Sequence, residues 1–506
     1  MNSTLFSKFN VPDESLALLS EGRRISYGEL DAQVKRLAVA LLGLGLRAGD
    51  LFAFLLPNSP EMLYVYMACA RTGIVGLPLS QRISAAELAF QIEDSGARAL
   101  LYGSDFAALV ASRRTELSHL EHLLSENFIE QVALSRASSL DIQLKASDPF
   151  CVMYTGGTTG QSKAAVQSHE SWMCSLETSV EQWGLSASDR HLIVLPMSHA
   201  AWYTAGATLL AGGSVTIVKH WDPHRVLELV EKHRVTTLNM IPTMLNDLIG
   251  AFNASARDVR SIRLLTVAGS VLPIATYERS RAIFGEVIGN VYGLTELAGP
   301  VSFLLPAHMA GGKFRSVGRL GKHIEMTLLD DEGQSTTSPR GELGLAGPQV
   351  STGYLNNVDE TRNAFSGKWF KTGDVVEVDR DGFLYVVDRK KDMIKTGGFN
   401  VYPSEVEQVL YRHAGVLEAA VVGVPDKKWS EALTAVVVLR PGPQFSADEL
   451  IAYCRADLAG HKVPKAVHFA LKLPRTRFGK FDKAQILKDL MADDSSESCG
   501  DDKKPS

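Results

Sequence analysis

The sequence predicts an α/β protein: a large N-terminal part of layered α/β subdomains with a small β subdomain, followed by a small, mobile α+β unit. Strand-like and helix-like segments alternate over the first 150 residues, which is typical of layered sheets with parallel strand pairing. From Ser316 onwards, short strands are separated by glycine turns, which indicates a small antiparallel β subdomain. The last hundred residues combine helical patterns with apolar strands, and they form the predicted C-terminal unit.

The predicted alternation of strands and helices follows from the spacing of hydrophobic residues. Leucines and alanines recur every three or four residues over 29–46, which predicts a helix, and residues 51–56 form an apolar run typical of a buried strand. A second helix is predicted over 85–95 and a second strand over 97–102. The same pattern continues with a strand at 215–218, a helix at 223–233 and a strand at 237–239.

The C-terminal unit is predicted to contain two helices, over 404–413 and 446–458, and two strands, over 417–422 and 434–439. A charged run at 389–392 lies between this unit and the preceding strand, and exposed polar residues of this kind mark domain boundaries. We therefore expect an N-terminal domain over 1–388, a hinge over 389–392, a mobile domain over 393–485 and a disordered tail over 486–506.

Composition limits the possible functions. A chain of 506 residues is too long for one hydrophobic core, so several domains are expected. The net charge of −5, without a basic stripe, argues against a nucleic-acid partner. Five scattered cysteines without a CxxC pair argue against a disulfide framework and a zinc site, and they favour a cytoplasmic protein. The first ten residues show no secretory signal pattern.

One long segment, 192–218, contains no Asp, Glu, Lys or Arg, a property that it shares with membrane spans. Pro196, His199 and the pair Gly212–Gly213 interrupt it. A buried strand–loop–helix–strand is therefore predicted, and no membrane span.

The strongest local signal is the segment from Tyr154 to Lys163, which follows a strand-like run. Glycines allow a backbone to approach a polyanion closely, and hydroxyls and a lysine add donors and charge. The residues concerned are Thr155, Gly156, Gly157, Thr158, Thr159, Gly160 and Lys163. The segment is not a Walker A loop, because Gln161 and Ser162 follow Gly160 in place of Lys and Ser/Thr. A phosphate-binding loop is predicted, and the alternative is a flexible surface turn.

Four further segments are weaker when each is taken alone. The run from Tyr292 to Glu296 offers an aromatic ring, a hydroxyl and a carboxylate, which suit a base, a phosphate and Mg²⁺, or simply form a strand end. Asp374 follows a glycine turn, where it could bind ribose hydroxyls or cap the turn. Lys395 and Lys480 lie beside glycines, and the alternative for both is a solvated surface lysine.

Together and in this order, these segments resemble the adenylate-forming superfamily of acyl-CoA synthetases, firefly luciferase and peptide-synthetase adenylation domains. The resemblance extends from about Ser26 to Lys483. It implies an enzyme that uses ATP and Mg²⁺ to convert a carboxylic acid into an acyl-adenylate, and then forms a thioester with coenzyme A.

The resemblance also implies a role for each matching residue. The loop residues Thr155 to Lys163 would contact the β- and γ-phosphates of ATP. Base and ribose would be bound by Gly269, Ser270, Tyr292, Asp374 and Arg389.

The catalytic steps are assigned in the same way. Thr295 would hold the α-phosphate and Glu296 the Mg²⁺ ion. Lys480 would bridge the carboxylate and the α-phosphate during adenylation, and Lys395 would enter the site after the small domain swings about Lys391. The segment Gly397–Gly398–Phe399 looks most like that of CoA ligases, which implies a CoA-binding role.

The acid pocket is assigned to His199, Ala200, Trp202, Val291 and Gly293. His199 falls near the position where peptide synthetases place an aspartate for the α-ammonium, so an α-amino acid is not expected. The branched side chain of Val291 and the bulk of Trp202 should shorten the pocket, which favours an aryl, cyclic or short aliphatic acid.

Three other functions remain open from the sequence. They are a stand-alone adenylating enzyme that loads a carrier protein, an oxidative enzyme of luciferase type, and a nucleotide-binding protein without catalysis. The presence of both Lys395 and Lys480 argues against the last of these.

Overall fold

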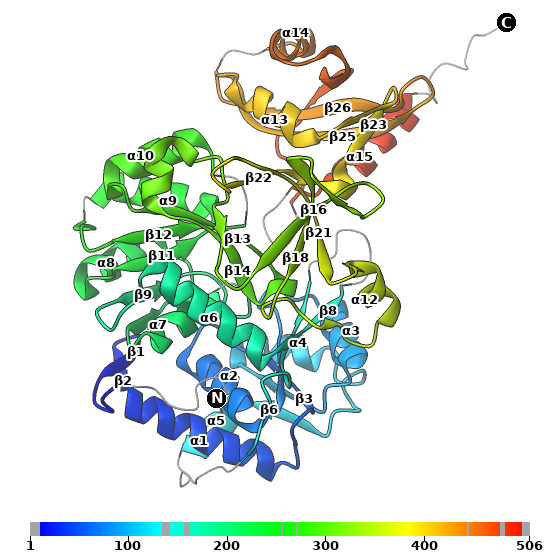
Figure 1. The fold of residues 1–506 in the computed structure, drawn as a ribbon. Coiled ribbons are helices and arrows are strands. Elements are labelled where there is room, and N and C mark those ends of the chain that lie inside the picture. Colours follow the sequence, from blue (N-terminus) through cyan, green and yellow to red (C-terminus); the bar gives the residue numbers. More distant parts are fainter. Residues whose placement is uncertain are drawn as a thin grey trace, which may run out of the picture.

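The computed structural model describes residues 11–133, 142–155, 162–199, 201–255, 257–269, 272–442, 445–475 and 481–497. Within these residues, four β-sheets and their helices organise the chain, and the predicted α/β class is confirmed (Figure 1). Two large sheets lie in the lower body, a smaller sheet adjoins them, and the C-terminal unit caps the molecule in this view.

The largest sheet has the strand order β15-β14-β13-β12-β11-β9-β10-β1-β2. Its strands from β13 to β1 in this order are parallel, whereas β2, β14 and β15 pair antiparallel at the edges. The strands are β1 (Leu16–Ser20), β2 (Arg23–Ser26), β9 (Arg190–Ile193), β10 (Ser214–Ile217), β11 (Thr237–Met240), β12 (Leu264–Val267), β13 (Ile288–Leu294), β14 (Gly299–Leu304) and β15 (Arg319–Leu320).

The second large sheet has the order β19-β8-β7-β4-β3-β5-β6 and is parallel from β7 to β6. Its strands are β3 (Leu51–Leu55), β4 (Val75–Pro78), β5 (Ala99–Tyr102), β6 (His122–Ser125), β7 (Pro149–Tyr154), β8 (Ala164–Ser168) and β19 (Gly353–Tyr354). Its outermost strand, β19, comes from almost 200 residues further along the chain and pairs antiparallel with β8.

Helices cover the two large sheets, and serine caps fix where several of them begin. Ser26 and Glu29 form a capping box, so the first helix begins at Tyr27, before the predicted residue 29. Ser84 and Glu87 do the same for the helix predicted over 85–95. The helices are α1 (Tyr27–Gly43), α2 (Pro60–Thr72), α3 (Ala85–Ser95), α4 (Ala107–Ala111), α5 (Asn127–Ala133), α6 (His169–Trp183), α7 (Ala201–Leu210), α8 (Pro223–His233), α9 (Pro242–Ser255), α10 (Ile274–Phe284), α11 (Pro306–His308) and α12 (Val358–Ala364).

The small sheet confirms the antiparallel β subdomain predicted after Ser316. Its pairings are antiparallel, and its core includes Leu343, Leu345 and Val376. The strands are β16 (Glu325–Leu329), β17 (Ser335–Thr336), β18 (Arg340–Ala346), β20 (Phe365–Ser366), β21 (Trp369–Val378) and β22 (Leu384–Arg389).

The C-terminal unit has a sheet of its own and a separate hydrophobic core. A short 3-10 helix, Lys390–Asp392, connects β22 to it. Its elements are β23 (Ile394–Thr396), β24 (Phe399–Val401), α13 (Pro403–Arg412), β25 (Val416–Asp426), β26 (Ser430–Leu439), α14 (Ala447–Asp457), β27 (Ala466–Phe469) and α15 (Lys483–Glu497).

The end of the chain differs from the sequence-based expectation of a disordered tail from residue 486. Helix α15 continues to Glu497, because Ile486 and Leu490 are buried against the apolar face of β25 and β26. Residues 498–506 lie outside the described residues.

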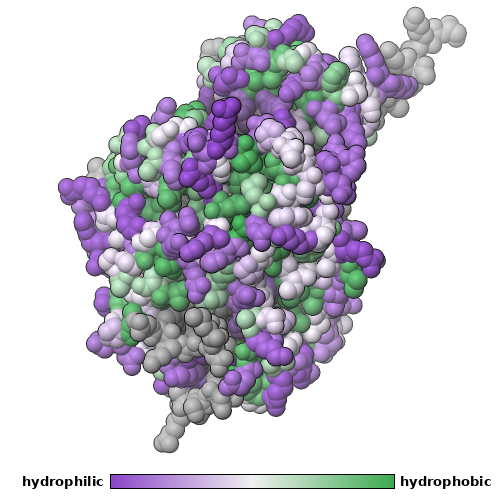
Figure 2. All heavy atoms as spheres, in the orientation of Figure 1, coloured by the Kyte–Doolittle hydropathy of each residue, from purple (hydrophilic) through white to green (hydrophobic). Residues whose placement is uncertain are grey.

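The uncharged segment 192–218 forms the end of β9, a loop, α7 and β10, as predicted. Among the described helices, none has both the length and the apolar character needed to span a membrane. On the face shown in Figure 2, hydrophilic residues predominate and hydrophobic ones are interspersed among them.

Candidate active site

Several predicted site residues lie where parallel strands end. Gly269 follows β12, Tyr292 lies near the end of β13, and Thr155 follows β7 of the second sheet. In open α/β sheets, ligands bind outside the carboxyl ends of the strands. Residues that the sequence singled out thus lie at the edges of the two large sheets where a ligand is expected to bind.

Asp374 is the centre of a cluster that joins β13, β21 and β22. The Tyr292 hydroxyl donates to Oδ2 of Asp374 at 2.5 Å, and Nε of Arg389 lies 2.5 Å from Oδ1. The register of β21 and β22 places Asp374 opposite Arg389, so backbone pairing brings them together. Asp374 is only 3% exposed, and a buried carboxylate needs such partners to remain charged.

The electrostatics of this cluster fix its hydrogen-bond directions. Burial, followed by the charge of Asp374, raises the pKa of Tyr292 well above its usual value. The phenol therefore remains a donor at physiological pH, and Asp374 remains the acceptor.

A cavity of about 290 Å³ lies beside the cluster and is lined by Gly373, Arg389, Lys390 and Lys391. Burial lowers the pKa of Lys391, and the positive charges of Arg389 and Lys163 add to this effect while Asp392 and Asp374 oppose it. The predicted hinge residue thus lies within electrostatic reach of both Asp374 and the predicted phosphate loop. The cationic lining suits an anionic ligand.

Thr295 and Glu296 form a 3-10 turn, Thr295–Leu297, directly after β13. The backbone of this turn is held from two sides: the Gln167 amide donates to the carbonyl of Thr295, and the Ser351 N–H donates to the carbonyl of Glu296 at 2.7 Å. The Glu296 carboxylate accepts a hydrogen bond of 2.9 Å from the Tyr354 hydroxyl.

Lys163 lies at the end of the predicted phosphate loop, where β8 begins. Its Nζ is 2.5 Å from Oε2 of Glu360 and 5.4 Å from the centre of the Tyr354 ring. Gln167, Tyr354 and Glu360 were not anticipated, because they reach the site through pairing of distant segments and carry no local motif.

Of the predicted acid-pocket residues, Trp202 and Val291 are buried, whereas Gly293 is exposed. Trp202 is fully buried, with its ring stacked on Tyr66 at 4.3 Å and next to Trp172 at 5.9 Å. Val291 is buried on β13, and a Cβ on Gly293 would lie 2.3 Å from the carbonyl oxygen of Gly299. His199 is half-buried, and its Nδ1 lies 3.1 Å from the Ser198 hydroxyl.

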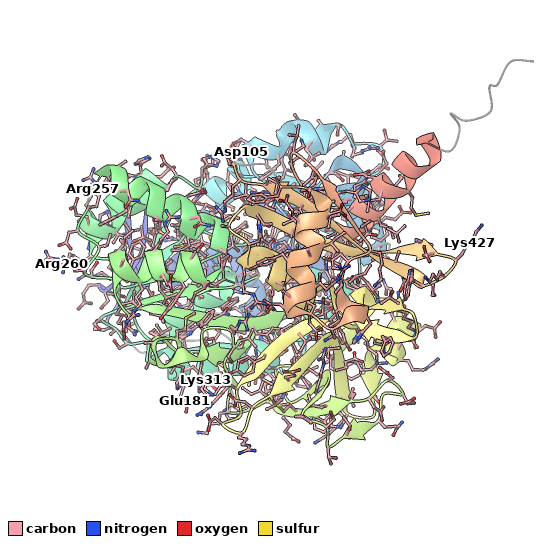
Figure 3. The ribbon with its side chains drawn as sticks, turned by 90° about the horizontal axis from the view of Figure 1, so that it is seen from above. Asp105, Glu181, Arg257, Arg260, Lys313 and Lys427 are labelled. Atoms are coloured by element: carbon pink, nitrogen blue, oxygen red, sulfur yellow. The ribbon has the colours of Figure 1, made fainter. Side chains whose placement is uncertain are left out.

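The predicted CoA segment and Lys395 belong to β23, β24 and the turn between them in the C-terminal unit. Lys395 is exposed, and its backbone N–H donates to Glu431. Gly397 and Gly398 occupy the turn with positive φ, and Phe399 is 54% exposed and stacks on His461 at 4.5 Å. Viewed from above in Figure 3, the C-terminal unit overlies the junction of the other sheets.

Eight predicted site residues lie outside the described residues: Gly156, Gly157, Thr158, Thr159, Gly160, Ala200, Ser270 and Lys480. The residues on either side of Lys480 contact the C-terminal sheet and each other. Arg475 forms an ion pair with Glu418 at 2.5 Å, and an antiparallel β-bridge joins Arg475 to Phe481.

Comparison with known proteins finds relatives that align with this chain over nearly the full length of both sequences. Feruloyl-CoA synthase of Amycolatopsis sp is 35% identical, with 92% of this chain and 94% of the relative covered. The 2-succinylbenzoate–CoA ligase of Bacillus subtilis is 33% identical (95% and 96%), and a long-chain-fatty-acid–CoA ligase of Mycobacterium tuberculosis is 32% identical (93% and 94%).

Solved structures give the same result. ATP-bound MatB from Rhodopseudomonas palustris superposes with a TM-score of 0.89 at 29% identity, with 97% of this chain and 99% of that chain covered. The apo form of MatB has a TM-score of 0.80 over the same shares of the two chains. The structure therefore resembles the ATP-bound form more than the apo form.

Family models match both parts of the chain. The AMP-binding enzyme model matches residues 7–355, and the AMP-binding enzyme C-terminal domain model matches residues 405–480. Together with the relatives, these matches confirm the resemblance found in the sequence and support ATP binding. This chain belongs to the AMP-binding enzymes, and among them to the AMP-forming acid–CoA ligase family.

Proposed function

We propose that this enzyme activates a compact aryl, cyclic or short aliphatic acid as an acyl-adenylate and then transfers the acyl group to CoA, releasing AMP and pyrophosphate. The observation that carries the proposal is the Tyr292–Asp374–Arg389 cluster beside its cationic cavity. A buried carboxylate can accept hydrogen bonds from ribose hydroxyls, and the neighbouring cations suit the phosphates of the same nucleotide.

The residues near Glu296 fit a nucleotide-bound Mg²⁺. No group of three or more potential metal-ligating side chains occurs in the part of the chain that the structure describes. Mg²⁺ is usually bound by one or two carboxylates together with substrate phosphates and water, so a single carboxylate on a fixed turn is an appropriate partner. Glu296 would supply that ligand, and the ion would neutralise charge as the carboxylate approaches the phosphate.

The two half-reactions place different demands on the same site. Adenylation brings two anions together and requires a cation at the α-phosphate, for which we propose Lys480. Thioester formation requires an entry path for the thiol, for which we propose the exposed segment of Gly397, Gly398 and Phe399 with Lys395 nearby. All of these residues belong to the C-terminal unit, so its rotation about Lys391 would exchange one set for the other.

The proposed size limit rests on Val291 and Trp202. Trp202 is held between two aromatic rings and cannot turn aside without breaking that packing. The names of two relatives point to aromatic acids, ferulate and succinylbenzoate, whereas a third names long-chain fatty acids. Acid length is therefore the property to measure.

The test is ATP–pyrophosphate exchange over a panel of aryl, short aliphatic and long-chain acids, followed by thioester formation with CoA. We expect exchange and thioester formation to be fastest with a compact acid. An optimum at twelve or more carbons would refute the size limit. Exchange without consumption of CoA would indicate that a carrier protein, and not CoA, accepts the acyl group. No exchange with any acid would refute the proposal.

Val291→Ala gives a sharper test of the size limit. Removing two methyl groups should move the optimum to a longer or bulkier acid, with a relative change in kcat/KM of about tenfold. Val215→Ala, in the buried strand β10, is a matched control and should leave the order of acids unchanged.

A further inference from the structure

Residues 351–361 lie between two segments that are far apart in the chain, the end of the phosphate loop and the turn that carries Glu296, and they contact both. At one end, Ser351 donates its N–H to the carbonyl of Glu296. Further along, Gly353 and Tyr354 form β19, which pairs with Val166 and Ala165 of β8. The segment thus contacts both structures that the proposed function assigns to phosphate and Mg²⁺ binding.

The side chain of Tyr354 contacts both of these structures at once. Its hydroxyl donates to Oε1 of Glu296 at 2.9 Å, and its ring lies 5.4 Å from Nζ of Lys163. This hydrogen bond to the carboxylate fixes the orientation of Glu296.

Glu360, on the first turn of α12, forms an ion pair with Lys163 at 2.5 Å. Both side chains are partly exposed, so an incoming anion can reach the lysine. A phosphate at Lys163 would be repelled by the nearby Glu360 carboxylate, so the two anions would compete for the ammonium.

The backbone holds Tyr354 and Glu360 in fixed relation. The Thr361 hydroxyl accepts from the N–H of Tyr354 at 2.9 Å and donates to the carbonyl of Asn357 at 2.8 Å. Gly353 has φ +141°, and a Cβ there would lie 2.5 Å from the Thr361 methyl group. The strand residue and the helix turn therefore form one rigid corner.

We propose that Tyr354 is a positioning residue that couples the Mg²⁺-binding carboxylate Glu296 to the phosphate-binding Lys163, and that Glu360 is a counter-anion that the phosphates of ATP displace from Lys163. This inference rests on the proposed function, because that function assigns Glu296 and Lys163 to Mg²⁺ and phosphate. It adds the residues that orient them and the anion that competes with ATP.

The first experiment removes only the Tyr354 hydroxyl. Calorimetric titration of full-length Tyr354→Phe with ATP, in EDTA and over a series of MgCl₂ concentrations, should show about a tenfold higher Mg²⁺ half-saturation. ATP affinity in EDTA should be unchanged, because the ring remains beside Lys163. Tyr385→Phe is the matched control, since its hydroxyl donates to Asp379 at 3.1 Å, and it should match the wild type.

The second experiment removes the counter-anion. Glu360→Gln should tighten ATP binding in EDTA about two- to fivefold at low salt, and the gain should disappear at high salt. The gain should also be absent when Lys163 is replaced by Met, because the competition then has no target. Glu325→Gln, which removes the 2.5 Å partner of Lys368, should leave ATP affinity unchanged.

An unchanged Mg²⁺ half-saturation in Tyr354→Phe would overturn the positioning role, and so would an equal loss of ATP affinity with and without Mg²⁺. Unchanged or weaker ATP binding by Glu360→Gln would overturn the counter-anion role. A wild-type protein that binds no ATP under any of these conditions would instead reject the proposed function itself, and this inference with it.

Discussion

The Asp374 cluster and the contacts that hold the C-terminal unit are both built from charged side chains, but they differ in burial. Asp374 is almost fully buried, and strand register sets its partner Arg389. The contacts of the C-terminal unit include Glu405, which pairs with Arg340 at 3.1 Å, and Gln408, which accepts from Arg315 at 3.0 Å. Ser404 also donates its N–H to Asp388 at 2.8 Å. The side chains of Arg340 and Glu405 are 32% and 22% exposed.

This difference supports our proposal that the Asp374 cluster stays fixed while the C-terminal unit rotates. Partly exposed ion pairs contribute about 0–1 kcal/mol each, so these pairs oppose a change in the orientation of the C-terminal unit only weakly. In the Asp374 cluster the carboxylate is buried although the Arg389 side chain is 37% exposed, and a buried carboxylate requires its partners, so the cluster keeps its geometry. Figure 1 shows the C-terminal unit as a separate cap above the small sheet with β16 and β22.

The largest effect is expected for Asp374→Asn, which removes the buried carboxylate at the centre of the Asp374 cluster. Loss of the carboxylate leaves Arg389 unpaired and removes an acceptor for the ribose, so kcat/KM for ATP should fall about 100-fold. Steady-state kinetics with varied ATP give the measurement. Asp379→Asn is a close control, because Asp379 also accepts from a tyrosine and pairs with Lys313 at 2.6 Å.

Asp379→Asn should change kcat/KM for ATP by less than threefold. If the two variants lost activity equally, the Asp374 cluster would have no special role in nucleotide binding, and a general effect on the β subdomain would explain the loss.

A smaller effect is expected for Glu405→Gln, which weakens the contacts of the C-terminal unit with Arg340 and of Glu405 with Lys462. The ratio of the thioester-forming rate to the pyrophosphate-exchange rate should change about two- to fivefold, since the two orientations would be populated differently. Glu377→Gln removes another partner of Arg340, within the small sheet, and should leave the ratio unchanged. Equal shifts in both variants would count against the interface role.

The smallest effect expected is a pH dependence of stability, which buried histidines cause and exposed ion pairs do not. Burial lowers the pKa of His169 to about 4, and neither ring nitrogen has a partner among the described residues. The unfolded chain therefore binds a proton between about pH 6.5 and 4 that the folded chain does not, so stability falls as pH falls through this range. From pH 7 to pH 5 this amounts to about 2 kcal/mol.

Thermal unfolding at pH 5, 6 and 7 measures this dependence. His169→Phe should flatten the loss of apparent Tm between pH 7 and pH 5 by about 1–2 °C relative to the wild type. The remaining slope should include a contribution from His191, whose pKa burial also lowers to about 4. An identical slope in both proteins would show that His169 is not held neutral by burial.

Local patterns in the sequence predicted much of the fold. Helix α3 has its predicted bounds because Ser84 and Glu87 form a capping box, a signal that lies wholly within a few residues. The helical extension to Glu497 was missed because it depends on packing of Ile486 and Leu490 against β25 and β26, which their own segment does not reveal.

The candidate site shows the same distinction. Tyr292, Asp374 and Arg389 each lie in a recognisable segment, and the structure brings them together. Tyr354 and Glu360 were missed because their contacts depend on the pairing of β19 with β8, across almost 200 residues of chain, and Gln167 was missed because its partner, the Thr295 carbonyl, belongs to a different sheet region. Such pairing has no local sequence signal, because only the tertiary fold creates it.

The fate of the carboxylate oxygen tests most directly whether the reaction passes through an acyl-adenylate. The full-length enzyme would be given ATP, CoA and a compact acid labelled with ¹⁸O in its carboxylate, and the products would be analysed by mass spectrometry. Attack of the carboxylate on the α-phosphate, followed by thioester formation, should leave one ¹⁸O atom in each AMP released. Unlabelled AMP, or label in inorganic phosphate together with ADP, would contradict the account.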